Sequence, residues 1–113
     1  MNIQIFGTKK DFDTKKAERF FKERGIKYQF IDMKEKGMSR GEFNAVCQSA
    51  GGVENLLDPD CRDRELLVLI QHLSPEDRLE KILENQRVIR TPVVRNGKQA
   101  TVGYQPEIWK RWE

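Results

Sequence analysis

The first part of the chain contains a strand–helix–strand pattern, and no other feature constrains the fold as strongly. Residues 2–6 alternate polar and apolar side chains and stop at Gly7, which is typical of a short strand. Apolar side chains then recur at helical spacing, at Ala17, Phe20 and Phe21. Gly25 stands where a helix commonly ends, and residues 27–32 form the next expected strand. A run this short favours two parallel strands joined by a right-handed crossover.

The middle of the chain, residues 39–85, is predicted to be a helical insert. Ser39 and Glu42 have the Ser-x-x-Glu spacing of a capping box, which opens the first helix of the insert. A second helix is expected over residues 62–73. Its apolar stripe consists of Leu66, Leu69, Ile70 and Leu73. The Ser-Pro pair at 74–75 supplies an N-cap and a first helical residue for a third helix.

The last third of the chain is predicted to form a hairpin and a closing helix. Strand patterns cover residues 88–89 and 92–95, and Asn96-Gly97 is typical of a type I′ turn before a strand over 98–102. A short helix is expected over 106–112. The element order is that of a thioredoxin-like fold, an α/β architecture with a mixed sheet of about four strands and a helical insertion between its βαβ and ββα halves. With 113 residues, the chain is expected to be a single domain, residues 1–113.

Composition and charge argue against several classes of protein. Lys and Arg number 21 against 18 Asp and Glu, so the net charge of +3 does not suggest a nucleic-acid binder. No apolar run is long enough to cross a membrane, and the first residues lack the pattern of a signal peptide, so we expect a cytoplasmic protein without membrane contact. Cys47 and Cys61 make no disulfide framework, and with one His they make no zinc-binding set, so no metal site is expected.

Three segments carry a resemblance to a known family: residues 6–17 (FGTKKDFDTKKA), residues 89–94 (IRTPVV) and residues 102–107 (VGYQPE). Together with the helical insert, they resemble the arsenate reductase (ArsC) family, which also contains Spx-type regulators and glutaredoxin-like proteins. The similarity runs from about residue 2 to residue 112. It implies a thioredoxin-like fold in which Pro92 is a cis-proline and the residue before it faces the active loop.

The chain departs from this resemblance at the catalytic positions. Enzymes of the family carry a nucleophilic cysteine at the position of Asp11, and dithiol members carry a second cysteine at the position of Thr14. A carboxylate suits the electrostatic setting of a helix N-terminus as a thiolate does, but it forms no intermediate at sulfur. Asp11 therefore keeps the negative charge of the thiolate but cannot act as its nucleophile. Because the surrounding motif is intact, the sequence leaves open whether Asp11 is the natural residue or a replacement for cysteine.

The arginines that hold the oxyanion in arsenate reductases are also missing. Alignment by motif places Asp58 or Glu54, Thr91 and Gln105 at the three positions where the resemblance implies arginine. Arg90 is the nearest arginine, and it lies one position before Thr91. Arsenate reduction by the family route is therefore not expected.

Ligand-binding residues are still expected within the retained motifs: Lys10, Phe12, Arg90, Thr91, Pro92 and Gln105. The alternative for Asp11 is a helix cap, a role for which Asp13 competes. Cys47 lies on an apolar stripe and is expected in the core, whereas Cys61 lies in a polar stretch and is expected to be an exposed, passive thiol.

Positive charge gathers around the first loop and helix, at Lys9, Lys10, Lys15, Lys16, Arg19, Lys22 and Arg24. Two interpretations remain open. The first is a surface for an anion or an acidic partner. The second is a solvated helix face, because Glu18 and Glu23 interleave with the cations.

Three functions are compatible with these observations. The first is a redox-inactive module that binds a small ligand or a protein partner and needs no cofactor. The second is a glutathione- or thioredoxin-linked thiol oxidoreductase related to arsenate reductases, with glutathione as the co-reactant. The third is an Spx-like regulator that docks on RNA polymerase. The resemblance suggests the second and third, whereas Asp11 favours the first.

Overall fold

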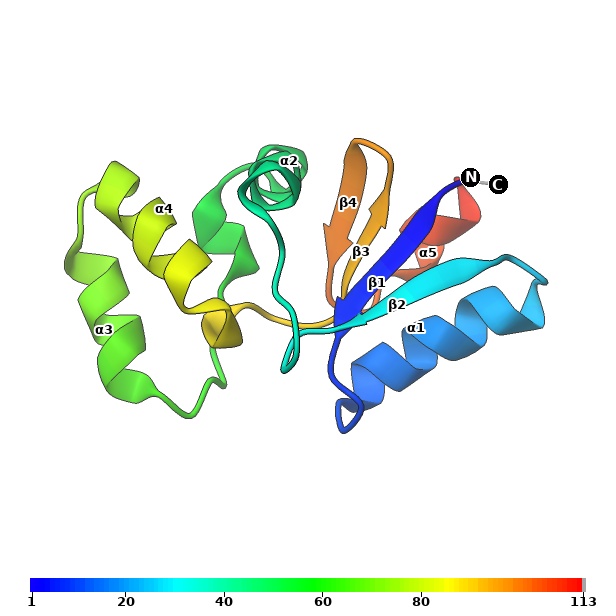
Figure 1. The fold of residues 1–113 in the computed structure, drawn as a ribbon, viewed down its shortest axis with the longest axis horizontal. Coiled ribbons are helices and arrows are strands. Elements are labelled where there is room, and N and C mark those ends of the chain that lie inside the picture. Colours follow the sequence, from blue (N-terminus) through cyan, green and yellow to red (C-terminus); the bar gives the residue numbers. More distant parts are fainter. Residues whose placement is uncertain (113) are drawn as a thin grey trace.

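The computed structural model describes residues 1–112, and a four-stranded mixed sheet lies at its centre (Figure 1). The strands are β1 (Ile3–Gly7), β2 (Tyr28–Asp32), β3 (Val93–Asn96) and β4 (Gln99–Val102). They lie in the order β2-β1-β3-β4, with β1 parallel to β2 and antiparallel to β3, and β3 antiparallel to β4. Ile5 pairs with Phe30 on one side and Val94 on the other. The thioredoxin-like topology expected from the sequence is confirmed.

The helices begin and end close to the residues that the sequence marks for capping. They are α1 (Phe12–Glu23), α2 (Arg40–Ala50), α3 (Arg64–His72), α4 (Pro75–Glu84) and α5 (Pro106–Lys110), with two 3₁₀ turns, η1 (Val53–Leu56) and η2 (Gln86–Val88). Ser39 and Glu42 form the predicted capping box of α2, and the Ser74 side chain accepts a hydrogen bond from the N–H of Asp77 in α4. Gly25 follows α1 with a φ of +67°, which glycine adopts without strain.

Each face of the sheet buries a separate hydrophobic core. On one face, α1 and α5 contribute to a core of Ile3, Ile5, Ala17, Phe20, Phe21, Val94 and Trp109. On the other face, the helices α2, α3 and α4 of the insert contribute to a core that includes Phe6, Phe43, Val46, Leu56, Leu67, Ile70 and Ile82. Ile5 and Phe6 enter opposite cores because side chains alternate across a strand. Figure 1 shows α3 and α4 at the end of the molecule away from α1, which gives it a long dimension of 43 Å.

The expected apolar stripe of α3 is partly wrong. The buried side chains are Leu67 and Ile70, whereas Leu69 is 46% exposed. Residues 66–70 are all apolar, so helical spacing does not select a face by itself. Packing in the core shared with η1 and α4 selects it.

The hairpin turn also differs from expectation. Asn96 is the last residue of β3 and pairs with Gln99, so the two-residue turn is Gly97-Lys98 rather than Asn96-Gly97. Gly97 has a φ of +62°, and no other residue of the turn has a positive φ. A type I′ turn needs positive φ at both central positions, so the turn is of the kind that places glycine first.

The segments that flank the hairpin are less regular than predicted. Val88 ends η2, and Ile89 makes one isolated bridge to Leu57, so these residues form no strand. α5 ends at Lys110, two residues before the expected end at 112. Within residues 1–112, no helix combines the length and the hydropathy that a membrane crossing needs.

Candidate functional site

Asp11 lies at the start of α1, and three donors bind its carboxylate. The Oδ2 atom accepts hydrogen bonds from the Thr14 N–H at 3.0 Å, the Thr14 hydroxyl at 2.6 Å and the Thr91 hydroxyl at 2.9 Å. Asp11 is therefore the N-cap of α1, and Asp13 lies in the first turn. A single oxygen thus joins the first loop to the segment that precedes Pro92. It sits where helix N–H groups would stabilise a thiolate.

Gly7 and the Thr91–Pro92 peptide bring these two loops together. The Thr91–Pro92 bond is cis, as the resemblance implies. Thr14 is fully buried, and a Cβ at Gly7 would overlap the Thr14 hydroxyl. Glycine at the end of β1 therefore leaves the room that Thr14 needs to reach the capping carboxylate. The Gly103 N–H donates to the Pro92 carbonyl at 2.8 Å and ties the end of β4 to the same loop.

A pocket of about 420 Å³ lies beside the cap, and its charge is mainly negative. Its lining residues are Asp11, Asp13, Asp58, Pro59, Asp60, Arg90 and Thr91. Four carboxylates face one guanidinium, so the pocket repels a dianion such as arsenate. The sequence did not lead us to expect Pro59 and Asp60 in the lining of this pocket. Their signal is the Asp-Pro-Asp turn, in which the Asp60 N–H donates to the Asp58 carboxylate at 2.9 Å.

Of the expected ligand-binding residues, only some line this pocket: Arg90 and Thr91 do, whereas Lys10, Phe12, Pro92 and Gln105 do not. Gln105 lines a neighbouring pocket of about 320 Å³, where its side chain donates to the Val102 carbonyl at 3.1 Å. Arg90 borders both pockets. Lys10 and Phe12 are exposed on the outer side of the loop, and Phe12 is 77% exposed, the most of any large apolar residue described. The structure therefore brings Arg90 to the cap and leaves Gln105 one pocket away.

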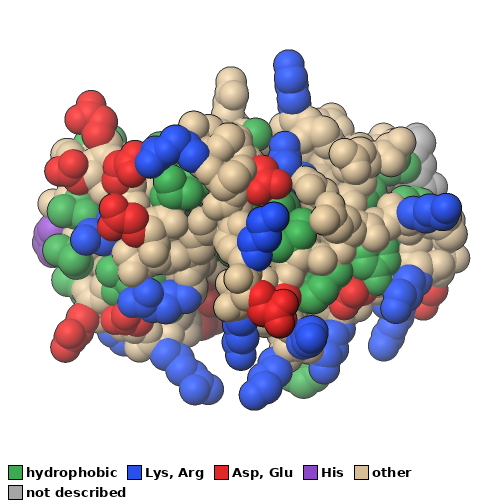
Figure 2. Space-filling view, viewed as in Figure 1, with side chains coloured by type: hydrophobic (Ala, Val, Ile, Leu, Met, Phe, Trp, Pro, Cys, Tyr) green, Lys and Arg blue, Asp and Glu red, His purple; other side chains and the backbone are tan. Residues whose placement is uncertain are grey.

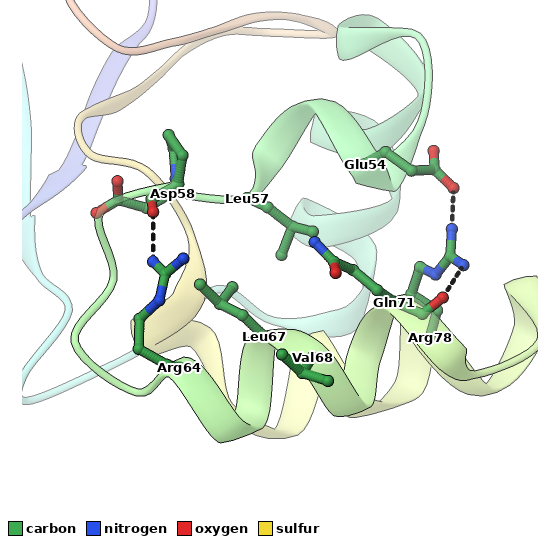
Figure 3. A pocket seen from close by; sticks show the side chains of 9 residues that line it. Glu54, Leu57, Asp58, Arg64, Leu67, Val68, Gln71 and Arg78 are labelled. Carbon is green, nitrogen blue, oxygen red and sulfur yellow. Dashed lines mark hydrogen bonds and ion pairs between the residues drawn. The ribbon is translucent and has the colours of Figure 1, made fainter.

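Asp58, not Glu54, lies beside Asp11. Glu54 belongs to a third pocket, of about 470 Å³, formed by η1, α3 and α4 (Figure 3). There the Arg78 guanidinium donates to Glu54 at 2.7 Å and to three carbonyls at the end of α3, those of Ile70, Gln71 and Leu73. Figure 3 shows the Arg78 guanidinium turned toward Glu54 and Gln71, with Leu57, Leu67 and Val68 farther along the pocket. This arginine therefore holds the insert together.

Neither cysteine lies in the pocket beside Asp11. Cys47 is buried on α2, and burial raises the pKa of its thiol to about 11. Cys61 is also buried, so the expectation of an exposed thiol is wrong. Its N–H donates to the Asp58 carbonyl in a tight turn, and its Sγ lies 3.8 Å from the Arg87 carbonyl, so the sulfur faces the core. Across residues 1–112, no group of three or more His, Cys, Asp or Glu is placed to hold a metal ion.

Asp11→Ala is expected to lower the free energy of unfolding by about 1–3 kcal/mol, because α1 loses its cap and two threonine hydroxyls lose their acceptor. Asp11→Asn keeps an acceptor oxygen, so its cost should be about half as large. Urea denaturation followed by circular dichroism measures both. Asp13→Ala is the matched control: Asp13 makes only a 3.9 Å surface pair with Lys16 and should cost about 0.5 kcal/mol. Equal losses at the two positions would contradict the capping role.

The buried thiol of Cys47 predicts a loss of stability at high pH. Its pKa is about 11 in the folded chain against an ordinary value of 9.0, so the unfolded chain ionises first as the pH rises. The stabilisation is complete below about pH 9 and is lost between about pH 9 and 11, to a total of about 2–3 kcal/mol. Urea denaturation across this range should therefore show a shallower fall for Cys47→Ala than for the wild type. The variant keeps the contribution of Tyr28, whose pKa is raised to about 12 by burial and by Glu18. Parallel curves for the two proteins would refute the expectation.

A sheet of this order, with a cis-proline beside the N-terminus of α1, defines a thioredoxin-fold protein. Residues 6–112 match the sequence model of the ArsC family, and the chain belongs to that family. The arsenate reductase from Vibrio cholerae has the same fold, with a TM-score of 0.80 at 23% identity over 98% of this chain and 97% of that one. A putative ArsC family related protein from Bacteroides fragilis superposes with a TM-score of 0.87 at 18% identity over 100% and 98% of the two chains.

A regulator is among the proteins of similar sequence. The global transcriptional regulator Spx 2 of Oceanobacillus iheyensis is 24% identical over 128 aligned positions, which cover 100% of this chain and 94% of the regulator. The chain thus belongs to the ArsC family, shares the fold of an arsenate reductase and is similar in sequence to an Spx regulator.

Proposed function

We propose that this chain is a redox-inactive member of the ArsC family that acts by binding. The observation that carries the proposal is the Asp11 carboxylate, which takes three hydrogen bonds at the position where the enzymes present a thiolate. An oxygen that caps α1 forms no disulfide and no bond to arsenic. Cys47 and Cys61 are buried outside the pocket, so neither supplies the missing sulfur.

The proposed binding surface surrounds the cap. Its residues are Lys10, Phe12, Arg90, Thr91 and, through the adjoining pocket, Gln105. Pro92, which was also expected to bind a ligand, is buried and lines neither pocket. The pocket itself carries four carboxylates and one guanidinium, so the groups that enter it should be neutral or cationic. The apolar ring of Phe12 on the outer side suits a larger partner that covers the rim.

A coupled reductase assay tests the proposal. The purified chain is incubated with arsenate or with a small disulfide, and NADPH oxidation is followed through glutathione and glutathione reductase, or through thioredoxin and thioredoxin reductase. We expect the rate of a heat-denatured control. Cys47→Ser and Cys61→Ser run in parallel, and a rate that disappears in either variant would establish a thiol oxidoreductase instead. Any sustained turnover above the control would refute redox inactivity.

Binding at the proposed surface is tested separately by amide chemical-shift mapping. Ligands that act through this surface should shift the amides of residues 7–14 together with that of Thr91. A library that includes amines, neutral amides, arsenate and phosphate tests the charge argument, because the two anions should leave these amides in place. Shifts from phosphate alone would contradict the expected ligand class.

An Spx-like regulator is the second candidate, and the full-length similarity to Spx 2 favours it. Such a regulator would act by docking on RNA polymerase, which needs no redox turnover. Co-elution of the tagged chain with purified RNA polymerase core enzyme during size-exclusion chromatography would support this candidate. Separate elution at micromolar concentrations of both proteins would count against it.

A further inference from the structure

The two edges of the sheet differ in how their backbone groups are satisfied. At the β4 edge, the Ser49 hydroxyl on α2 accepts a hydrogen bond from the Ala100 N–H at 2.8 Å and donates one to the Ala100 carbonyl at 3.0 Å. At the β2 edge, no hydrogen bond within residues 1–112 joins the backbone of residues 28–31 to any element except β1. The outer side of β2 is therefore an open row of backbone donors and acceptors.

The sequence of β2 does not protect this edge. Natural edge strands often carry a proline, a bulge or an inward-pointing charge, which prevents pairing with another chain. Residues 28–31 (YQFI) contain no proline and no charge, and their register with β1 is unbroken. Tyr28 and Phe30 are only partly buried, and Gln29 is exposed. Figure 2 shows hydrophobic side chains between the charged ones in the half of the molecule where β2 and α1 lie. The edge is therefore accessible to an extended segment.

A row of polar side chains crosses the face of the sheet opposite α1 and ends at this edge. Arg95 on β3 donates to the Gln4 Oε1 atom on β1 at 2.8 Å, and the Gln4 Nε2 atom donates to Gln29 Oε1 on β2 at 3.3 Å. At the other end of the row, the Glu42 carboxylate on α2 lies 3.7 Å from the Arg95 guanidinium. Within residues 1–112, no group accepts a hydrogen bond from Gln29 Nε2. The row thus ends on an amide donor that is still available.

We propose that β2 pairs in antiparallel orientation with β2 of a second copy of this chain. A twofold axis perpendicular to the sheet brings together side chains of the same face, because side chains alternate along a strand. With the axis at Gln29, this residue meets its own counterpart, and Tyr28 of each copy meets Phe30 of the other. With the axis at Phe30, Tyr28 would meet Asp32, and Gln29 would meet Ile31. The first register is favoured, because it pairs aromatic rings with each other and amides with each other.

This register is self-complementary, which selects a second copy over an unrelated peptide. Each Gln29 Nε2 atom can donate to Oε1 of the other Gln29, because a carbonyl oxygen accepts two hydrogen bonds. The polar row then runs from Arg95 of one copy to Arg95 of the other. The joined sheet has β4 at both of its edges, where Ser49 already occupies the backbone groups of Ala100. The assembly therefore closes as a dimer.

The length of β2 sets the expected strength of the dimer. The strand contains five residues, so the interface is small, and we expect a dissociation constant of about 1–100 µM. The residues of β2 do not line the pocket beside Asp11. The inference therefore holds whether or not the chain is redox-inactive.

Sedimentation equilibrium between about 1 µM and 1 mM tests the proposal, and the wild type should pass from monomer to dimer across this range. Gln29→Lys should weaken dimerisation by about fivefold to tenfold, because two like charges meet at the axis. Gln99→Lys is the matched control. It makes the same charge change at an exposed position of β4 and should change the dissociation constant by less than about twofold. Circular dichroism confirms that each variant is folded.

A mixture of two variants tests the register. Gln29→Lys and Gln29→Glu should each dimerise weakly alone, whereas their equimolar mixture should dimerise at least as tightly as the wild type, because opposite charges meet at the axis. A mixture no tighter than either variant would refute the proposed pairing. A chain that stays monomeric at about 1 mM, or equal losses in Gln29→Lys and Gln99→Lys, would also overturn the proposal. Pairing of β2 with an unrelated peptide in a chain that does not self-associate would show a different occupant and refute it.

Discussion

Trp109→Ala should lower the free energy of unfolding by about 3–5 kcal/mol, which is a large share of the roughly 5–15 kcal/mol that is typical of a whole domain. Trp109 is fully buried, and its ring lies 5.3 Å from those of Phe20 and Phe21, centre to centre. Its indole N–H donates to the Thr101 hydroxyl at 2.8 Å, inside the core. One side chain therefore joins α5 to both α1 and β4. Urea denaturation monitored by circular dichroism measures the loss.

Two further substitutions separate volume from hydrogen bonding at this position. Trp109→Phe keeps most of the apolar contact and leaves the buried Thr101 hydroxyl without its donor, so it should cost about 1–3 kcal/mol. Ile108→Ala is the matched control on the same helix, because Ile108 is 37% exposed, and it should cost about 1 kcal/mol or less. If Trp109→Ala costs no more than Ile108→Ala, the ring is not the link between the helices that its contacts indicate.

Most of the fold could be predicted because the decisive signals lie in adjacent residues. Ser39 and Glu42 are three positions apart, and the side chain of each accepts a hydrogen bond from the backbone N–H of the other. Gly25 ends α1 through a local conformation that other residues rarely adopt. The error in α3 arose because packing against distant residues decides which of its side chains are buried. Leu69 is apolar but exposed because the core lies on the Leu67 side of α3, and no spacing rule within the run 66–70 records that.

The candidate site was located only in part from the sequence. The motifs pointed to Asp11, Thr91 and Pro92, but the hydrogen bond from Thr91 to Asp11 joins residues 80 positions apart and depends on strand order. The acidic turn at 58–60 reaches the pocket because Leu57 bridges to Ile89, a pairing that no local pattern predicts. The same turn buries Cys61, whose polar sequence neighbours suggested exposure. Tertiary placement, rather than residue type, defines this pocket.

Asp11→Cys is expected to create a thiol that iodoacetamide alkylates at least about a hundredfold faster at neutral pH than any thiol of the wild type, whose two cysteines are buried. The Thr14 N–H lies 3.0 Å from the present carboxylate oxygen, and the helix dipole adds to its effect, so a thiolate at this position is stabilised. The nearby carboxylates of Asp13, Asp58 and Asp60 oppose this by raising the thiol pKa. Because these carboxylates are partly screened by solvent, we expect a pKa somewhat below that of an ordinary cysteine thiol.

The pH dependence of alkylation reports that pKa directly, and a Thr14→Ala substitution in the same variant should raise it, because one hydroxyl donor is lost. Alkylation with the pKa of an ordinary exposed cysteine, unaffected by Thr14→Ala, would show that the start of α1 does not stabilise an anion. We expect the reactive variant to remain inactive toward arsenate, because Thr91 and Gln105 supply no guanidinium and the pocket is acidic. Arsenate turnover in Asp11→Cys would mean that sulfur alone separates this chain from its enzymatic relatives, and the argument from pocket charge would then be wrong.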